Sequence, residues 1–467
     1  MLFGNERIDH VSGNPYHPYN MAGEPLDYAT PLAEALAVPA PACAKAQEAM
    51  NYAYSPYRIT QPLKRAGRRG EGKFEPISWE RLVQEVADGG RLFASAGDND
   101  VYPGLKDVLK DDPIDPKDPG LGSMRNGFVF IGGRDQGGYK DFSDRFVKQA
   151  VGSTNRIGHT DICGLGFRMG NYALTEGKDV ELKADPMACE YMLVFGANVY
   201  EALQPGINFY GALMARRHAE GSLKFVVVDP RGTNASAHAD AWLAVKPGQD
   251  NALAMGLIRV LLEENLFDSA FLSCFNEALA AQKGFTGYTN ACHLVVTQKG
   301  HAKEGRFLLM EDVDPALKGK DEGKAWTVAG PGGKAQDFAK ASSADLDFDG
   351  AVALADGSTL ACATSFALMK KEVLANALET YSQLSGIGVG DIQKTARDFA
   401  AHGRKAGVCQ YHGAGNYVGG TYAAYAVAML SVLVGSINQQ GGYMCSSGKA
   451  ADWKKGLFDL ASFSGAR

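Results

Sequence analysis

The sequence predicts an α/β protein built on doubly wound, mostly parallel sheets. Three apolar runs support this prediction, near residues 191–195, 223–228 and 241–245, and each leads through a polar loop into a helix-like segment. Continuous apolar strands that alternate with helices are typical of parallel sheets covered on both faces. Glycine accounts for 56 of 467 residues, about 12% against a usual ~7%. The glycines cluster after apolar runs, which suits backbone loops that wrap a large ligand.

Composition and charge argue against several classes of protein. The net charge of −6 gives no reason to expect nucleic acid or an anionic membrane surface as partner. The longest apolar run, residues 422–437, is interrupted by Ser431 and Gly435 and is short for a bilayer span, so we expect a buried helix. The eight cysteines form no C-x-x-C pair, and a chain of this length needs no disulfide framework. The first residues do not resemble a signal peptide.

The elements expected in the first third of the chain are short. Residues 1–70 predict a small irregular region. Residues 55–79 are basic and turn-rich, and they form either a solvated connecting arm or an arm that grips an anionic cofactor. Ser78 is the expected N-cap of the next helix. An apolar strand near residues 128–131 then runs into a glycine turn, followed by a helix at residues 140–151.

Polar loops follow the three apolar strands of the middle third. They are Gly196-Ala197-Asn198, Asp229-Pro230-Arg231 and Pro247-Gly248-Gln249-Asp250. Ligands of parallel sheets bind at the carboxyl ends of the strands, where all three loops are expected. The sequence therefore predicts a nucleotide-like ligand at this edge of the sheet.

The remaining pattern predicts the domain organisation. Residues 276–365 read as a β-rich insertion of short strands within an α/β domain at residues 156–375. Residues 71–155 and 376–467 are expected to join as a second, discontinuous α/β domain. The apolar runs around Val129 and Val408, each followed by glycines, would then lie in one sheet.

Cys163 stands alone in the stretch "HTDICGLGFRMGN". Three interpretations remain open from the residues themselves: a small buried hydrophobe, a nucleophile with His159 as its base, or a soft metal ligand. Standard nucleotide and hydrolase motifs are missing, since the chain has no correctly spaced G-x-G-x-x-G after a strand, no P-loop and no G-x-S-x-G elbow.

The same stretch resembles the segment that supplies the protein ligand to molybdenum in the DMSO reductase family of molybdopterin oxidoreductases. Four further blocks resemble that family in the same order: "CAKAQEAMNYAYSPYRITQPLKRAGRRGEGKFEPISWE", "LVFGANVYEALQPG", "VVVDPRGTNASAHADAWLAVKPGQDNALAMG" and "YHGAGNYVGGTYAAYAVAMLSVLVGSINQQGGY". Within the family, "TPLAEALAVPAPACAKAQEAM", "SPYRITQPLKR" and "DPIDPKDP" look most like tetrathionate reductases. Arsenate, selenate and polysulfide reductases are similar to them.

The resemblance implies a bis-molybdopterin guanine dinucleotide whose four dithiolene sulfurs hold molybdenum. Cys163 would ligate the metal, and the glycines would let the pterins approach. His159 and Arg168 would be catalytic residues that orient an anionic substrate, and a salt-bridged surface residue is the alternative for Arg168. The residues expected to bind the cofactor are Lys45, Gly133, Gly196, Asn198, Asp229, Arg231, Pro247, Gly248, Asp250, His412, Gly413 and Asn438.

Guanine offers two neighbouring N–H donors, which suit a carboxylate. Asp229 or Asp250 is therefore expected to contact it, with a helix N-cap as the alternative role of Asp250. By resemblance, Cys43 is the fourth ligand of a [4Fe–4S] cluster, and Lys45 lies between the cluster and a pterin. Position 46 is alanine where the family commonly has glycine.

The other three cluster cysteines are expected upstream of this chain, and a β-barrel-like domain downstream of it. The sequence is accordingly expected to be an internal fragment of a longer, exported enzyme, which acts in the periplasm or at the outer face of the cytoplasmic membrane. The implied partners are an iron–sulfur electron-transfer subunit together with a membrane-anchor subunit. The implied reaction is the reduction of an oxidised sulfur anion, tetrathionate to thiosulfate. Arsenate, selenate or polysulfide reduction, or a non-catalytic cofactor-binding module, are the alternatives.

Overall fold

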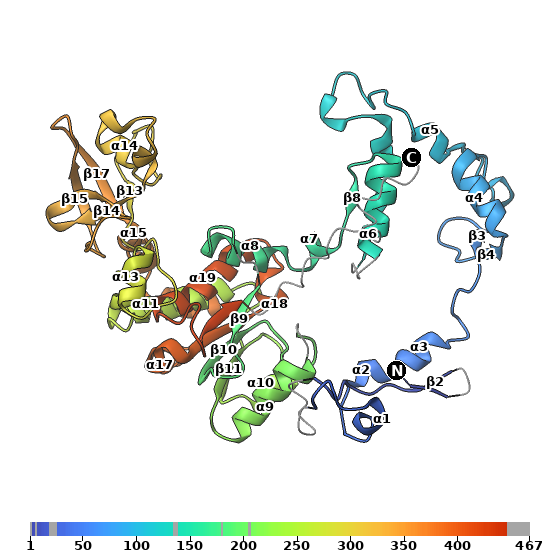
Figure 1. The fold of residues 1–467 in the computed structure, drawn as a ribbon, viewed down its shortest axis with the longest axis horizontal. Coiled ribbons are helices and arrows are strands. Elements are labelled where there is room, and N and C mark those ends of the chain that lie inside the picture. The colour runs from blue at the N-terminus through green and yellow to red at the C-terminus, as the bar shows by residue number, and fades with distance from the viewer. Residues whose placement is uncertain are drawn as a thin grey trace. The chain divides into compact units, whose positions relative to one another are not determined.

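The computed structural model describes residues 2–4, 7–17, 26–133, 139–178, 181–203 and 207–445 (Figure 1). These residues divide into two compact units. The first unit holds the residues up to Ser12 together with Ala42–Cys163, and the second holds those of Gly13–Pro41 and those from Gly164 onward.

A four-stranded parallel sheet is the centre of the second unit. Its strands are β10 (Tyr191–Phe195), β11 (Lys224–Val228), β12 (Ala241–Leu243) and β18 (Ala406–Gln410), in the spatial order β12-β11-β10-β18. The first three strands follow one another outward from β10, whereas β18 pairs with the other edge of β10. The order of the strands therefore reverses between β10 and β18, and this is the point where a doubly wound sheet binds its ligand.

Helices cover both faces of this sheet, as predicted. Alternate side chains of β10 point to opposite faces: Leu193 packs in one apolar cluster with the helices α11, α17 and α19, and Val194 packs in a second cluster with α9. Figure 1 shows the two layers on either side of the strands. Because both faces are buried, the strands read as continuous apolar runs instead of alternating ones. The helices named here are α9 (Ala212–Ala219), α11 (Asp250–Glu263), α17 (Val389–Ala401) and α19 (Gly420–Leu433).

Helix α8 (Leu165–Leu174) packs unusually closely against α18 (His412–Gly415) and α19. A Cβ added to Gly166 would lie 1.9 Å from the carbonyl oxygen of Gly415, and one added to Gly170 would lie 2.7 Å from the Cβ of Ala424. Both glycines are therefore required by the contact between helices, with the spacing G-x-x-x-G. The expectation that the glycines around Cys163 make room for a pterin is not supported at these two positions, because backbone already fills the space.

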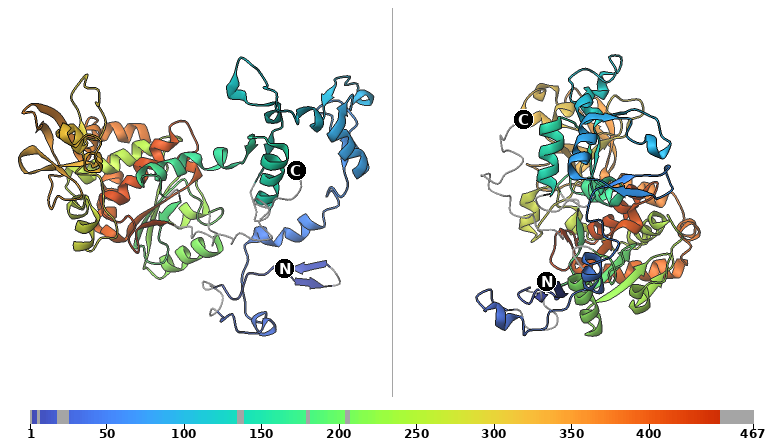
Figure 2. Two further views of the ribbon diagram at one scale, coloured as in Figure 1. Left: turned by 45° about the horizontal axis from the view of Figure 1, so that its top comes forward. Right: turned by 90° about the vertical axis from the view of Figure 1, so that its right-hand side faces the viewer.

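The β-rich insertion is present at one end of the second unit, apart from the parallel sheet (Figures 1 and 2). It combines a three-stranded antiparallel sheet with a two-stranded one, and it has its own apolar core. Its strands are β13 (Leu294–Val296), β14 (Thr327–Gly330), β15 (Lys334–Asp337), β16 (Asp349–Ala353) and β17 (Thr359–Thr364).

His293, just before β13, is buried among the rings of Phe307, Trp326 and Phe338. Burial lowers the pKa of His293 to about 4. In the unfolded chain the His293 imidazole takes up a proton near pH 6.5. The free energy of unfolding should therefore have its full value above that pH and should fall as the pH drops toward 4. The loss is expected to reach about 3 kcal/mol. Hydrogen exchange of the insertion amides between pH 4 and 7 measures it, and His293→Leu should abolish the pH dependence. An equal dependence in that variant would contradict the assignment.

The remaining elements of the second unit connect these parts. They are α1 (Leu32–Ala35), β9 (Leu182–Ala184), η5 (Ile207–Gly211), α10 (Asn234–His238), α12 (Ser269–Leu272), α13 (Glu277–Gln282), α14 (Met310–Val313), η6 (Pro315–Leu317), η7 (Asp321–Lys324), η8 (Pro331–Gly333), α15 (Ser365–Leu374), α16 (Leu378–Ser385), η9 (Gly403–Lys405) and β19 (Tyr443–Cys445). Strand β19 pairs with β9 in an antiparallel ribbon.

The first unit consists of short elements. They are β1 (Leu2–Gly4), β2 (Arg7–His10), α2 (Ala44–Gln47), α3 (Ala49–Ala53), β3 (Leu63–Arg65), β4 (Phe74–Pro76), α4 (Trp79–Asp88), β5 (Gly89–Gly90), η1 (Ala94–Ala96), β6 (Tyr102–Pro103), α5 (Leu105–Val108), η2 (Pro119–Leu121), η3 (Met124–Gly127), β7 (Phe130–Ile131), α6 (Tyr139–Asp144), η4 (Arg145–Val151), β8 (Arg156–Ile157) and α7 (Thr160–Cys163). The predicted irregularity of residues 1–70 agrees with this pattern, as does the N-cap: the Ser78 hydroxyl accepts from the Arg81 amide at 3.2 Å.

Basic residues of the arm at residues 55–79 form ion pairs with acidic residues that follow the arm in the sequence. Lys64 binds Glu85 at 2.7 Å, and Arg65 binds Asp98 at 2.6 Å while its guanidinium lies 4.2 Å from the centroid of the Phe93 ring. These pairs tie β3 to α4 and to the loop after it, so Lys64 and Arg65 are largely buried and not solvated as the connecting-arm alternative expects.

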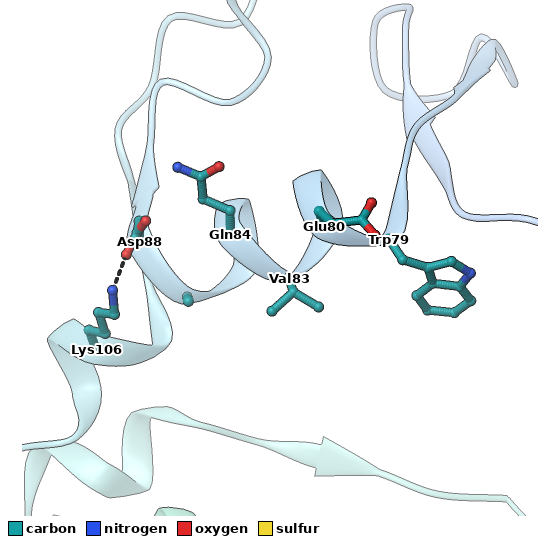
Figure 3. A pocket seen from close by; sticks show the side chains of 7 residues that line it. Trp79, Glu80, Val83, Gln84, Asp88 and Lys106 are labelled. Atoms are coloured by element: carbon teal, nitrogen blue, oxygen red, sulfur yellow. Dashed lines mark hydrogen bonds and ion pairs between the residues drawn. The ribbon is translucent and has the colours of Figure 1, made fainter.

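Helix α4 has an exposed apolar face that borders a shallow pocket (Figure 3). Trp79 and Val83, one turn apart, are 65% and 63% exposed, and an ion pair between Asp88 and Lys106 lies at one end. No predicted site residue lines this pocket.

The predicted common sheet for Val129 and Val408 is wrong. Val408 lies in β18 and pairs with Leu193 of β10, whereas β7 begins one residue after Val129 and pairs in parallel with β8. Strand β18 instead joins the sheet of the middle third, where it pairs in parallel with β10. The joining of residues 71–155 with 376–467 as one domain stays a prediction. None of the helices in the described ranges combines the length and apolar character that a bilayer crossing requires.

Candidate functional site

The candidate site begins at the point where the strand order reverses. Gly196 directly follows β10 and has φ +52°, and its carbonyl oxygen accepts from the amide of Gly413, which follows β18, at 3.0 Å. A Cβ at Gly196 would lie 2.4 Å from the amide nitrogen of Ala414. The two predicted residues Gly196 and Gly413 therefore meet as bare backbone, and only glycine fits at this approach.

Beside this contact the structure leaves a buried acceptor without a partner. The side-chain amide nitrogen of Asn198 donates to Glu201 at 2.8 Å, whereas the side-chain oxygen Oδ1 of Asn198 is buried and meets no hydrogen-bond donor among the described residues. Asn234 of α10 donates to the other oxygen of Glu201 at 2.9 Å. Leaving a buried acceptor unpaired costs about 1–3 kcal/mol, so this oxygen fits a ligand that brings an N–H or O–H group.

Asp250 and Asp229 lie at the same edge, at the ends of β12 and β11. Asp250 is 4% exposed, and burial, together with repulsion from Asp229, raises the pKa of Asp250 to about 6. The N-cap of α11 is Gln249, and Asp250 is the first residue inside the helix, so the alternative role as N-cap is wrong. A buried carboxylate with this pKa suits a ligand with neighbouring N–H donors.

We expect Asp250→Asn to stabilise the cofactor-free protein. The pKa of Asp250 is about 6 in the folded protein and lower in the unfolded chain. The free energy of unfolding should therefore decrease as the pH rises from 4 to 6, because ionised Asp250 destabilises the fold. Above pH 6 the variant should gain on the order of 2–3 kcal/mol. Thermal melts at pH 4 and pH 7.5 measure this, and the gain should vanish at pH 4. Asp349→Asn is the control, because Asp349 is exposed in β16. A gain for Asp250→Asn that is equal at both pH values would refute the explanation.

Three other predicted residues surround this edge. Gly248 has φ +75°, and the ring of Tyr417 lies 3.7 Å from the position of its missing Cβ. Arg231 and Pro247 are exposed. The amide of Arg231 donates to the carboxylate of Asp229 at 2.8 Å, which fixes the loop after β11. Seven of the predicted residues therefore lie at this edge, in the loops that follow β10, β11 and β12. They are Gly196, Asn198, Asp229, Arg231, Pro247, Gly248 and Asp250.

Arg168 and His412 face each other across Gly164. A Cβ at Gly164 would lie 2.9 Å from Nε2 of His412 and 3.1 Å from Nη1 of Arg168. Arg168 also forms an ion pair with Glu181, and both side chains are largely buried. The predicted alternative of a salt bridge is therefore present, although not at the surface.

The first unit holds five of the predicted residues: Cys43, Lys45, Gly133, His159 and Cys163. Cys163 ends α7 and is partly exposed, and Nδ1 of His159 donates to the carbonyl oxygen of Gly133 at 3.0 Å. Cys43 is the N-cap residue of α2, and Lys45 lies exposed within that helix. Across the described ranges, no three His, Cys, Asp or Glu side chains gather closely enough to hold a metal ion.

Asn438 is the predicted residue that the structure places elsewhere. It has φ +54° and lies in a turn, where its side chain donates to the carbonyl oxygen of Thr286 at 3.3 Å. The turn contacts Ala188 and Arg404 through Gly441 and Gly442, and these residues precede β10 and β18. Asn438 is thus near the amino ends of the strands, away from the edge that carries the other residues.

The sequence analysis did not predict four residues that contact the predicted site residues or one another. They are Glu181, Lys183, Tyr411 and Glu201. The first two lie in a short stretch, "VELKA", that showed no motif. Tyr411 directly precedes the predicted His412, and Glu201 follows the predicted Asn198 by three residues, so the strand-end rule could have included them.

The comparison with known proteins identifies the family. Residues 140–451 match the family described as Molybdopterin oxidoreductase. The chain belongs to this family. The match to the molybdopterin oxidoreductase family covers both the segment of Cys163 and the whole parallel sheet.

Several relatives of this molybdopterin oxidoreductase are reductases. It is 31% identical to a tetrathionate reductase subunit of Archaeoglobus fulgidus over 94% of this chain and 44% of the relative. It is 32% identical to the Salmonella typhimurium protein of the same name, over 98% of this chain and 45% of the relative. A selenate reductase subunit of Mesobacillus selenatarsenatis is 30% identical, over 94% and 45%. The chain thus spans about half the length of the curated relatives it matches.

A solved structure supports the fold. Acetylene hydratase from Pelobacter acetylenicus superposes with a TM-score of 0.51 at 18% identity, over 86% of this chain and 39% of that one. Membership of the family implies a molybdenum–molybdopterin cofactor. The described residues fit the polar part of such a group, because the edge of the sheet offers an unpaired buried acceptor, a buried carboxylate and a close approach of bare backbone.

Proposed function

We propose that this molybdopterin oxidoreductase reduces an oxidised sulfur anion, with tetrathionate as the substrate. Tetrathionate accepts two electrons, its central S–S bond breaks, and two thiosulfates leave. The molybdenum cofactor supplies the two-electron chemistry when it is bound. The observation that carries the proposal is the similarity to two tetrathionate reductase subunits over more than nine-tenths of the chain.

The residues of this chain would bind and orient the reactants. Cys163 would supply the thiolate ligand to molybdenum. His159 and Arg168 would offer N–H donors to the anion. Asp250, with Asp229 beside it, would accept from guanine if the cofactor carries guanine dinucleotides, and Asn198 would accept from the same ligand.

Electron supply and location belong to the same proposal. Cys43 would be one ligand of a [4Fe–4S] cluster, and Lys45 would lie between that cluster and a pterin. Electrons would arrive through an iron–sulfur subunit, with a membrane anchor, at the outer face of the cytoplasmic membrane or in the periplasm. Selenate reduction is the second candidate, because a selenate reductase subunit matches at 30% identity; arsenate and polysulfide reduction remain alternatives.

The proposal is tested on the purified holoenzyme that contains this chain. Tetrathionate, selenate, arsenate and polysulfide are each offered with reduced viologen as electron donor, and molybdenum, iron and guanine nucleotide are quantified in parallel. We expect tetrathionate to give the highest kcat/KM. Selenate as the best substrate would replace the proposal by the second candidate. Bound pterin without turnover of any acceptor would indicate a cofactor-binding module.

A further inference from the structure

Glu201 joins two of the loops at the carboxyl edge of the parallel sheet. One of its carboxylate oxygens accepts from the side-chain nitrogen of Asn198, in the loop after β10, at 2.8 Å. The other oxygen accepts at 2.9 Å from the side-chain nitrogen of Asn234, which is the first residue of α10 and follows β11. Two side-chain amides therefore present their N–H groups to one carboxylate.

The backbone on both sides of this carboxylate is held by hydrogen bonds of its own. The backbone amide of Glu201 donates to the carbonyl oxygen of Asn198 at 3.1 Å, which closes a turn. On the other side, the hydroxyl of Thr233 caps α10 by accepting from the amide of Ser236 at 3.2 Å, so Asn234 is fixed at the start of a helix. Glu201 thus links two loops whose shapes are already defined.

The carboxylate of Glu201 decides which way the Asn198 amide faces. An ionised carboxylate only accepts hydrogen bonds, so it attracts the amide nitrogen and repels the amide oxygen. The nitrogen therefore lies toward Glu201, and the oxygen Oδ1 is buried without a donor among the described residues. The two ends of a side-chain amide have nearly the same shape, so without this carboxylate either end could take either position.

A buried acceptor that is fixed in this way selects the chemistry of the ligand group beside it. It pairs with an N–H or O–H group, whereas a ligand oxygen without a proton would leave both acceptors unpaired. The nucleoside part of a molybdopterin dinucleotide carries such donors on its ribose and on guanine, and an ionised phosphate carries none. Asn198 would therefore recognise the nucleoside and not the pyrophosphate.

We propose that Glu201 is a positioning residue, which together with Asn234 holds the Asn198 amide so that its oxygen accepts a hydrogen bond from the nucleoside part of the cofactor. The inference rests on the proposed function for the presence of a molybdopterin dinucleotide. It goes beyond that function in assigning Glu201 and Asn234, and in stating which atom of Asn198 meets the ligand and which ligand groups that atom accepts.

A double-mutant cycle tests whether Glu201 acts through Asn198. The full-length protein that contains this chain is prepared without cofactor, and its affinity for guanosine diphosphate is measured by calorimetry. Asn198→Ala and Glu201→Ala should each weaken binding about tenfold, as expected when one buried hydrogen bond is lost. The double variant should also bind about tenfold more weakly and not a hundredfold, because Glu201 then has no amide left to orient.

Glu220→Ala is the matched control for this cycle. Glu220 also accepts from a neighbouring side chain, that of Arg216 at 2.8 Å, but it is exposed and lies before the amino end of β11. Its replacement should change the affinity less than about twofold. Melting temperatures show which variants are folded. If Glu201→Ala does not fold, Glu201→Gln replaces it in the cycle with an expected loss of about threefold, since a side-chain amide accepts from Asn198 in only one of its two orientations.

Additive losses in the double variant would overturn the proposal. A folded Glu201→Ala or Glu201→Gln protein that binds like the wild type would also overturn it, as would a wild-type protein that does not bind guanosine diphosphate. Titrations with 2′-deoxyguanosine diphosphate and inosine diphosphate assign the donor to the ribose or to the base. A protein that shows the coupling, while its holoenzyme reduces no tetrathionate, would refute the substrate and leave the positioning role standing.

Discussion

Replacing Cys163 by alanine should abolish turnover while the protein keeps its pterin. We expect the rate to fall by on the order of a thousandfold or more, which corresponds to about 4 kcal/mol or more of lost transition-state stabilisation. The reason is that one thiolate is the only ligand this chain is proposed to contribute to molybdenum, whereas the organic part of the cofactor would be held by the strand-end loops. Steady-state turnover and pterin fluorescence after acid extraction give the two measurements.

Cys362→Ala is the matched control for this substitution. Cys362 is fully buried in β17 of the insertion, and burial raises the pKa of its thiol to about 11, so it is inert. Its replacement should cost some stability and no activity. Cys163→Ser should retain part of the activity, because an alkoxide can also bind the metal. Wild-type turnover in the Cys163→Ala enzyme would rule out the assignment of the ligand.

Gly166→Ala should strongly destabilise the second unit. The added Cβ would lie 1.9 Å from the carbonyl oxygen of Gly415, and the clash is with backbone that cannot rotate away. Overpacking typically costs about 1–3 kcal/mol, and we place this substitution at about 3 kcal/mol or more. The melting temperature should fall by roughly 6–10 °C. Thermal or urea unfolding followed by circular dichroism measures it.

Gly390→Ala provides the comparison. Gly390 lies exposed in the first turn of α17, and no atom lies within 4 Å of its added Cβ. Alanine there should stabilise the helix by up to about 1 kcal/mol, because glycine is the poorer helix former. If Gly166→Ala unfolded at the wild-type temperature, the close packing of α8 on α18 would be absent in solution.

The glycines around Cys163 show that a sequence motif can be compatible with two different structural roles. The spacing of Gly166 and Gly170 was visible in the sequence, but it is compatible with a ligand-binding turn and with a crossing of two helices. The partner decides between them, and the partner, Gly415 to Tyr425, lies about 250 residues away along the chain. Local sequence carries no signal for such a contact.

The type of each strand, the loops that follow the strands and the family could all be inferred from the sequence. Runs such as residues 191–195 are apolar at every position because both faces of the sheet are buried, and this property is local. The same holds for the Ser78 cap and for the β-rich insertion, whose short strands and turns follow from neighbouring residues.

The tertiary structure was needed to show which strand lies beside which, and which side chains meet. Strand β18 pairs with β10, so His412 and Tyr411 come next to Arg168 and Lys183, while Asn438 is carried to the opposite end of the strands. Pairing of strands depends on which apolar edges and faces are left to be covered after the whole chain has collapsed. That is a property of the complete core, so no window of sequence could have placed Lys183 against the ring of Tyr411.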